Sequence, residues 1–343
     1  MSKIFKTDKP LVFIVGNSRS GTTMMGRIVG KHSEVFTFHE LHFFEQLRTV
    51  QEQNDFTSES EAEQLAARLF CIQRDGYLNQ KNPNRFLSEA KELVAKADAQ
   101  NSTSASIFKE FLFYESAVNN KVIPCEQTPR NVFYINEILK LYPEAKIINM
   151  IRDPRDVLLS QKRKWKRRFL GAHKIPLREA IRSKINYHPI IISKLWNSSI
   201  YAADKFADHD QVYSLYFEEL LKEPEVKVKE ICDFIGISFN QDLLQVPQVG
   251  SSMGLDRPEQ KGVDPTKTKH WQKGGLSKTE VFLCQQITKS LREKHGYYST
   301  PTQSNPLKLI YSLISLPIQL TLILLVNFNR MRGLKEAIKK RLI

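Results

Sequence analysis

The sequence predicts an α/β fold with a P-loop-like central parallel sheet flanked by helices, helical insertions and a C-terminal apolar helix. Three stretches predict it. Residues 11–29 form a pattern of strand, glycine-bounded loop and helix, and residues 147–160 form a second strand, turn and helix. Residues 309–328 are apolar and nearly uncharged. Strands that alternate with helices favour a parallel sheet, because each helix carries the chain back to the start of the next strand.

The first unit has the geometry of an anion-binding loop. An apolar run at 11–15 ends at Gly16, and Gly21 precedes the helical pattern. Such a loop directs backbone N–H groups and a helix dipole at a phosphate. The glycine spacing matches the ATP- and GTP-binding loop, but Thr22 stands where that loop has its lysine. With Arg19 inside the loop, the pattern favours a smaller anionic group, and an ordinary strand-to-helix turn is the alternative.

The second unit places an arginine at a strand end. The apolar run 147–151 predicts a buried parallel strand that ends at Arg152, and Asp153 and Pro154 then begin a helix that reaches Ser160. Ligands of open α/β sheets bind at the carboxyl ends of strands. The plainer alternative is that Arg152 only pairs with an acid at the helix terminus.

The remaining elements are predicted coarsely. Residues 45–120 are mainly helical and polar and predict a lid or insertion, and residues 161–208 are helical and basic. Residues 212–216 predict another strand and residues 220–235 a helix of apolar period. Residues 245–275 predict a long loop, and long loops without structure of their own are usually functional or disordered.

Together the two units resemble the PAPS-dependent sulfotransferase family, with some similarity to its protein-tyrosine and carbohydrate members; PAPS is 3'-phosphoadenosine 5'-phosphosulfate. The resemblance rests on RSGTT after one strand, on RDPRDVLLS after another and on FEELLKEPEVKVKEICDFIGI at 217–237. It implies transfer of a sulfuryl group from PAPS to a hydroxyl or amine. It also implies that the 5' side of the nucleotide is bound by Arg19, Ser20, Gly21, Thr22 and Thr23, and the 3' phosphate by Arg152 and Ser160.

Two positions depart from the family pattern. A family tyrosine falls on Phe217, and a lysine that is often catalytic falls on Gln127. A neutral amide donates hydrogen bonds but supplies no full charge to the transferring group. If Gln127 is the matching position, Arg19 or Arg130 must carry more of that task.

The acceptor hydroxyl needs a base near its proton. By resemblance, Glu40 aligns with the glutamate base of the protein-tyrosine members, and His39 and His42 are the rival candidates. Aromatic neighbours in FTFHELHFF would desolvate a carboxylate and raise its pKa. The HELH spacing does not match the zinc helix signature, and the leaving phosphate requires no metal, so none is expected.

A family loop that closes over the nucleotide is matched loosely by a basic segment before the last helices. Its candidates here are Lys269 and Trp271, with Lys267, His270 and Lys273 beside them. Trp271 either stacks on the adenine or fills the core, since indoles are mostly buried in any case.

The composition is basic, with a net charge of +14 and a pI near 9.5, which favours anionic partners. The cluster KRKWKRR at 162–168 is interpreted first as a solvated helix face and second as a wall around the 3' phosphate or a polyanionic acceptor. No nucleic-acid-binding module accompanies the charge. Four separated cysteines without a C-x-x-C pair are typical of a reducing compartment.

The C-terminal tail predicts a membrane contact. Residues 309–328 have about the length of a bilayer span, although Pro317 interrupts them, and the sequence that follows to 341 is basic. A packed C-terminal helix is the alternative. We therefore expect a sulfotransferase domain at 1–300 and a membrane-associating tail at 301–343. Because residues 1–10 are polar and resemble no signal peptide, we expect the cytoplasmic face of a membrane.

The sequence leaves the acceptor and the oligomeric state open. A glycan, a lipid-linked glycan or a small hydroxylated molecule would suit the same chemistry. Two other functions remain: a P-loop-like kinase or nucleotide-binding protein, and a catalytically inactive PAPS-binding homologue.

Overall fold

The computed structural model describes residues 9–47, 58–80, 82–96 and 103–328. Its main sheet has five parallel strands in the order β2-β3-β1-β4-β5. Their bounds are Val12–Gly16 for β1, Val35–Thr37 for β2, Ile123–Glu126 for β3, Lys146–Ile151 for β4 and Val212–Tyr216 for β5. This confirms the predicted α/β fold, with a parallel sheet flanked by helices and an apolar helix near the C-terminus.

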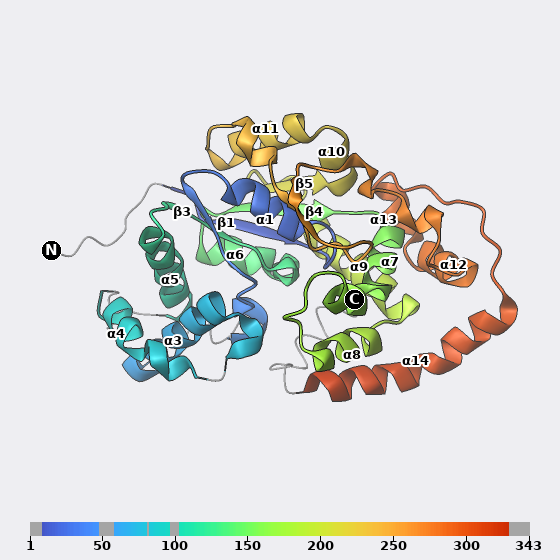
Figure 1. Cartoon of the computed structure of the whole chain (residues 1–343), viewed down its shortest axis with the longest axis horizontal. Coiled ribbons are helices and arrows are strands. Elements are labelled where there is room, and N and C mark those ends of the chain that lie inside the picture. Colours follow the sequence, from blue (N-terminus) through green and yellow to red (C-terminus); the bar gives the residue numbers. More distant parts are fainter. Residues whose placement is uncertain (1–8, 48–57, 81, 97–102, 329–343) are drawn as a thin grey trace.

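Helices cover both faces of the sheet (Figure 1). They are α1 Thr22–Gly30, α3 Glu59–Asp75, α4 Leu87–Lys96, α5 Ser104–Val118, α6 Ile135–Leu141, α7 Pro154–Lys162, α8 Leu177–Ile185, α9 Pro189–Asp204, α10 Phe217–Lys222, α11 Pro224–Ile235, α12 Lys278–Ile287, α13 Lys289–Lys294 and α14 Pro306–Asn327. In addition, a π-helical turn spans Phe43–Leu47 and a small antiparallel pair joins β6 Pro247–Gln248 to β7 Arg257–Lys261.

Side chains of β1 point alternately to the two faces of the sheet and contribute to a separate hydrophobic core on each face. Phe13 and Val15 pack with residues of α3, α5 and α6, whereas Val12 and Ile14 pack with residues of α1, α10 and α11. Successive side chains of a strand point to opposite faces, so a fully apolar strand is buried on both sides. This burial fixes the register that aligns Gly16 of β1 with Met150 of β4, and both flanking loops therefore start at one edge.

Two local expectations differ from the structure. The single helix expected at 220–235 is two helices, α10 and α11, because Pro224 has no N–H to continue α10 and instead begins α11. The loop expected at 245–275 contains the β6–β7 pair and short 3-10 turns at Pro265–Lys267 and His270–Lys273.

Candidate active site

The two predicted anion-binding loops lie against each other at the carboxyl ends of β1 and β4. Nη1 of Arg152 donates a hydrogen bond to the carbonyl oxygen of Arg19 at 3.2 Å. Nε of Arg19 donates to Oγ of Ser160, on α7, at 2.9 Å. Residues assigned by resemblance to opposite ends of one nucleotide therefore belong to a single site.

The loop before α1 is held in an unusual conformation. Arg19 and Gly21 have φ angles of 76° and 100°, in the region that favours glycine. A Cβ atom added at Gly21 would lie 2.4 Å from Cδ2 of Phe217. The same phenylalanine ring lies 4.3 Å from Cζ of Arg152, a cation–π contact. The Phe217 ring thus packs against both loops, at Gly21 and at Arg152.

Polar groups of the loop are available to a ligand. Ser20 is fully buried, and its Oγ has no hydrogen-bond partner among the described residues. Thr23 is exposed, whereas Thr22 is buried and its Oγ1 accepts a hydrogen bond from Nε2 of Gln127 at 3.3 Å. A buried donor without a partner is costly, so Ser20 fits a site that takes a hydrogen-bonding ligand.

Positive charge is concentrated here. Burial, together with the neighbouring guanidinium groups of Arg152 and Arg167, lowers the pKa of Arg19 to about 10. Like charges in a desolvated site repel until an anion binds between them. The residues present therefore fit a phosphate-bearing or sulfate-bearing substrate.

A segment at 250–256 covers the two loops. Nη2 of Arg19 donates to the carbonyl oxygen of Gly250 at 2.9 Å, and the hydroxyl of the buried Ser252 lies 2.9 Å from that of Ser160. Asp256 anchors the segment by accepting two hydrogen bonds from Arg167, at 2.7 and 2.8 Å. A bound nucleotide must compete with these contacts for Arg19 and Ser160.

The basic segment at 267–273, which precedes the last helices, is anchored by α7. The carboxylate of Asp156 accepts backbone N–H bonds from Lys269 at 2.8 Å and from Trp271 at 3.0 Å. The Trp271 indole is buried against Leu159, and Cζ of Arg155 lies 4.1 Å from the centre of its ring. Trp271 therefore fills the core, one of the two roles expected for it, and contact of Lys269 and Trp271 with the nucleotide stays a prediction.

Glu40 follows β2 and lines a cavity of about 610 Å³. Its side chain is 45% exposed, and its carboxylate lies 3.5 Å from Nε2 of His42. Loss of hydration among the surrounding protein atoms raises the pKa of Glu40, while Lys164, Arg130 and Arg19 oppose that shift. A raised pKa brings a carboxylate closer to the value that suits a general base. His39 also lines the cavity.

A buried carboxylate that we did not predict fixes the backbone beside Glu40. Glu126, at the end of β3, accepts hydrogen bonds from the backbone N–H of Leu41 at 3.4 Å, from that of Thr128 at 3.1 Å and from Nδ2 of Asn131 at 2.7 Å. Burial raises the pKa of Glu126 to about 7. The sequence did contain a signal for Glu126, an acid at the end of an apolar run. In the segment EQTPRN, however, we considered Gln127 and not Glu126.

The basic cluster at 162–168 is largely engaged rather than solvated, which corrects the interpretation that we placed first. Lys162 pairs with Glu280 at 2.7 Å, Arg167 pairs with Asp256, and Lys164 lines the same cavity as Glu40. The side chain of Lys164 is exposed, but partial loss of hydration beside the surrounding protein and the charge of Arg19 lower its pKa to about 8.

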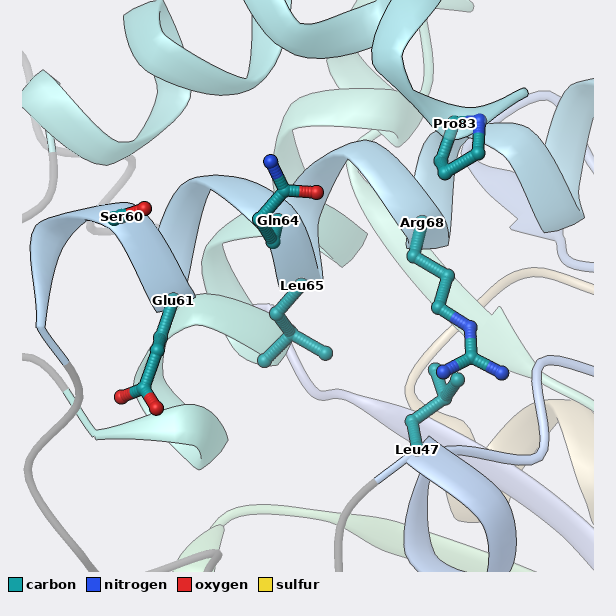
Figure 2. Close-up of a pocket in the computed structure, with 7 residues that line it drawn as sticks. All are labelled: Leu47, Ser60, Glu61, Gln64, Leu65, Arg68 and Pro83. Carbon is teal, nitrogen blue, oxygen red and sulfur yellow. The ribbon is translucent and has the colours of Figure 1, made fainter.

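A second cavity, of about 340 Å³, lies over α3 (Figure 2). Arg68 extends toward Leu47 across it, and Nε of Arg68 donates to Oε1 of Gln80 at 3.1 Å. Glu61 is engaged in the N-terminal cap of α3. None of the predicted site residues lines this cavity, whereas Glu40 and His39 line the larger one.

An anion-binding loop at the first strand of a parallel sheet, paired with an arginine at a neighbouring strand end, defines a P-loop-like phosphate- or sulfate-binding protein. The model of the sulfotransferase family matches residues 10–241, so the chain belongs to the sulfotransferase family. Membership confirms the resemblance found in the sequence.

Two relatives by sequence are distant. A putative protein-tyrosine sulfotransferase of Caenorhabditis briggsae is 22% identical over 73% of this chain and 74% of its own length. An uncharacterized protein of Aquifex aeolicus is 23% identical over 68% of this chain, which spans only 26% of that protein's length.

Solved structures agree on the fold. The sulfotransferase domain from the curacin biosynthetic pathway is similar with a TM-score of 0.51 and 19% identity, over 85% of this chain and 99% of that one. The sulfotransferase domain from the Synechococcus PCC 7002 olefin synthase has a TM-score of 0.50 and 19% identity, over 88% and 99%. At this identity they support the fold alone.

Proposed function

We propose that the chain transfers the sulfuryl group of PAPS to a hydroxyl, or an amine, of an acceptor. The observation that carries the proposal is the contact between the two loops, in which Arg152 donates to Arg19 and Arg19 donates to Ser160. Family membership supports it. Ser20, Gly21, Thr22 and Thr23 would bind the 5' phosphosulfate together with Arg19, and Arg152 and Ser160 the 3' phosphate.

The residues of the site suit an in-line transfer. The acceptor oxygen forms a bond to sulfur while the bond from sulfur to the phosphate oxygen breaks, and the acceptor proton passes to the Glu40 carboxylate. The products are the sulfated acceptor and adenosine 3',5'-bisphosphate. Arg19 and Lys164 would stabilise the charge that spreads over the sulfuryl oxygens, since preorganised cations supply most of the catalysis in such transfers. Lys164 thereby takes the place of the family lysine that is Gln127 here.

Calorimetry with adenosine 3',5'-bisphosphate tests the nucleotide. We expect micromolar or tighter binding that does not depend on magnesium, with ATP bound more weakly. Preference for ATP with magnesium would instead favour a P-loop-like kinase. Turnover with radiolabelled PAPS then separates an enzyme from an inactive PAPS-binding homologue.

We also propose that residues 301–343 form a tail that attaches the sulfotransferase domain at 1–300 to the cytoplasmic face of a membrane. Among the described residues one helix, α14, is long and apolar enough to cross a bilayer, with a mean hydropathy of 2.2 and none of that window buried. The basic sequence at 330–341 lies outside the described residues. A basic end after an apolar helix favours an anionic membrane surface.

A further inference from the structure

The large cavity has chemically different ends. One end is formed by the loop after β1 and the proposed base, with Asn17, Ser18, Glu40 and Lys164 among its lining. The lining from α8, α9 and α14 is mixed: Leu195 and Ile323 contribute apolar side chains, whereas Glu179, Arg182 and Asn327 contribute polar ones. A volume of about 610 Å³ is in the range that holds a small molecule. The cavity therefore offers polar groups beside Glu40 and both apolar and polar groups between α8, α9 and α14.

Helix α14 packs with polar side chains against the domain. The hydroxyl of Ser315 lies 3.4 Å from Nε2 of His188, and Nε2 of Gln319 donates to the carbonyl oxygen of Ile185. Near the end of the helix, Nη1 of Arg182 donates to Oδ1 of Asn327 at 2.7 Å. A helix of a soluble domain normally buries a mainly apolar side, whereas the side of α14 toward the domain mixes these polar residues with apolar ones such as Leu316 and Ile323.

The outer side of α14 is apolar. Ile314 is 66% exposed and Leu325 is 69% exposed. Helix α8, which contacts α14, continues this surface with Leu177 and Ile181, 55% and 52% exposed. Arg178, on the same helix, is also exposed and supplies positive charge. An exposed apolar surface bordered by basic residues matches an interfacial membrane site rather than open water.

Figure 1 shows α14 running along the outside of the domain, below α8. Ile323 is the link between the two surfaces, because it comes from this outer helix and also lines the cavity that contains Glu40. A molecule held in a bilayer against α14 would therefore meet the end of the cavity that Ile323 lines first.

We propose that the acceptor is a hydroxyl-bearing amphiphile taken from a lipid bilayer. Its apolar chain would lie between α9 and α14, at Leu195 and Ile323, and its hydroxyl would reach Glu40. The inference rests on the proposed sulfuryl transfer and specifies its acceptor. The acceptor oxygen bonds to sulfur, the sulfur–phosphate oxygen bond breaks, and the proton leaves to Glu40, so the product is a lipid sulfate ester.

The test compares primary alcohols of increasing length, from 1-butanol to 1-dodecanol, with the full chain and radiolabelled PAPS. We expect kcat/KM to rise by about tenfold or more from the shortest to the longest alcohol, because each methylene buried in the cavity adds to binding. A flat dependence on chain length overturns the proposal. So does a preference for a tyrosine peptide or a free glycan over dodecanol.

Substitutions in the cavity lining test whether the apolar chain of the acceptor lies between α9 and α14. Ile323→Trp should reduce the ratio of dodecanol to butanol kcat/KM by about tenfold, by filling the site of the apolar chain. Leu195→Phe provides a second, milder obstruction if the first variant folds poorly. Val226→Trp is the matched control, because Val226 is a half-exposed apolar residue on α11, outside the cavity lining. An unchanged ratio in both cavity variants overturns the path.

The source of the amphiphile is tested by presenting dodecanol either in anionic vesicles or dissolved without lipid. Faster transfer from vesicles supports a bilayer source, and equal rates overturn it. Adenosine 3',5'-bisphosphate binding, measured on the same preparation, separates the two proposals. Binding without any transfer to alcohols contradicts only the amphiphilic acceptor, whereas absence of binding contradicts the sulfotransferase function itself.

Discussion

Glu40 and Lys164 line one cavity with opposite charges and with pKa values shifted toward each other. Such a pair gives a bell-shaped pH–rate profile, with an acid limb and a basic limb. The carboxylate must be deprotonated to accept the acceptor proton, so the rate falls as the pH drops through the raised pKa of Glu40. The ammonium must be protonated to stabilise the sulfuryl oxygens, so the rate falls as the pH rises through about 8.

Glu40→Gln should lower kcat by roughly 10²–10⁴-fold, the usual contribution of a general base, and remove the acid limb of the pH profile. The affinity for adenosine 3',5'-bisphosphate, measured by calorimetry, should stay within about twofold, since Glu40 has no role in holding the phosphates. His39→Ala is the comparison, and a larger loss there than in Glu40→Gln would transfer the role of base to the histidine.

Lys164→Arg should retain activity and move the basic limb from about 8 beyond the measurable range, because a guanidinium stays protonated there. Lys164→Met should lower kcat by about tenfold or more, as removal of a donor to a developing charge does. Lys166→Met, two residues along the same turn and exposed, is the control and should leave the profile unchanged. A basic limb that persists in Lys164→Arg would contradict the assignment.

The conformation of the loop between β1 and α1 depends on close packing of the Phe217 ring, from α10, against Gly21. Gly21→Ala introduces a Cβ 2.4 Å from the Phe217 ring at a φ of 100°, so the loop must move. We expect the affinity for adenosine 3',5'-bisphosphate to fall by about a hundredfold or more, equivalent to about 2.7 kcal/mol.

Gly236→Ala is a matched control for backbone strain. Gly236 has a φ of 74° at the end of α11, and a Cβ there would meet nothing within 4 Å. Both substitutions cost about 1 kcal/mol of backbone strain, which thermal unfolding would measure. Only Gly21→Ala should change the nucleotide affinity, and equal effects on affinity would mean that strain, not the Phe217 contact, shapes the loop.

Elements with strong local signals could be predicted from the sequence. The placing of both loops at one edge of the sheet was predicted, because parallel strands bring their carboxyl ends together. The hydrogen bond from Arg152 to the carbonyl oxygen of Arg19 was not predicted. The break before α11 was missed, since apolar periodicity continues through Pro224 although the backbone cannot.

Contacts between distant segments could not be predicted. Lys162 and Arg167 find their acids 118 and 89 residues away, at Glu280 and Asp256. A basic run has the same local pattern whether its partners are water, carboxylates or a substrate. The polar contacts of α14 with the domain were hidden for the same reason: its serine, glutamine and asparagine only diluted an apolar stretch until their partners on α8 and α9 were known.

At the scale of the whole molecule, α14 and α8 present an apolar surface that water does not favour, and this predicts membrane binding. The full chain should float with anionic phospholipid vesicles in a density gradient, and added salt should weaken the binding by screening the basic residues. Exposure of Ile314 and Leu325 in the described structure locates the contact.

Replacing both residues by glutamate, Ile314→Glu with Leu325→Glu, should leave the protein at the bottom of the gradient. Each apolar side chain withdrawn from the bilayer forfeits about 1.5–3 kcal/mol, and each carboxylate resists desolvation. Val226→Glu, on the opposite side of the sheet from the cavity, should float like the unmodified chain. Nucleotide affinity should be equal in all three proteins, because α14 lies outside the phosphate loops. If the double variant still floats, another surface binds the membrane and the exposed apolar residues of α14 serve some other contact.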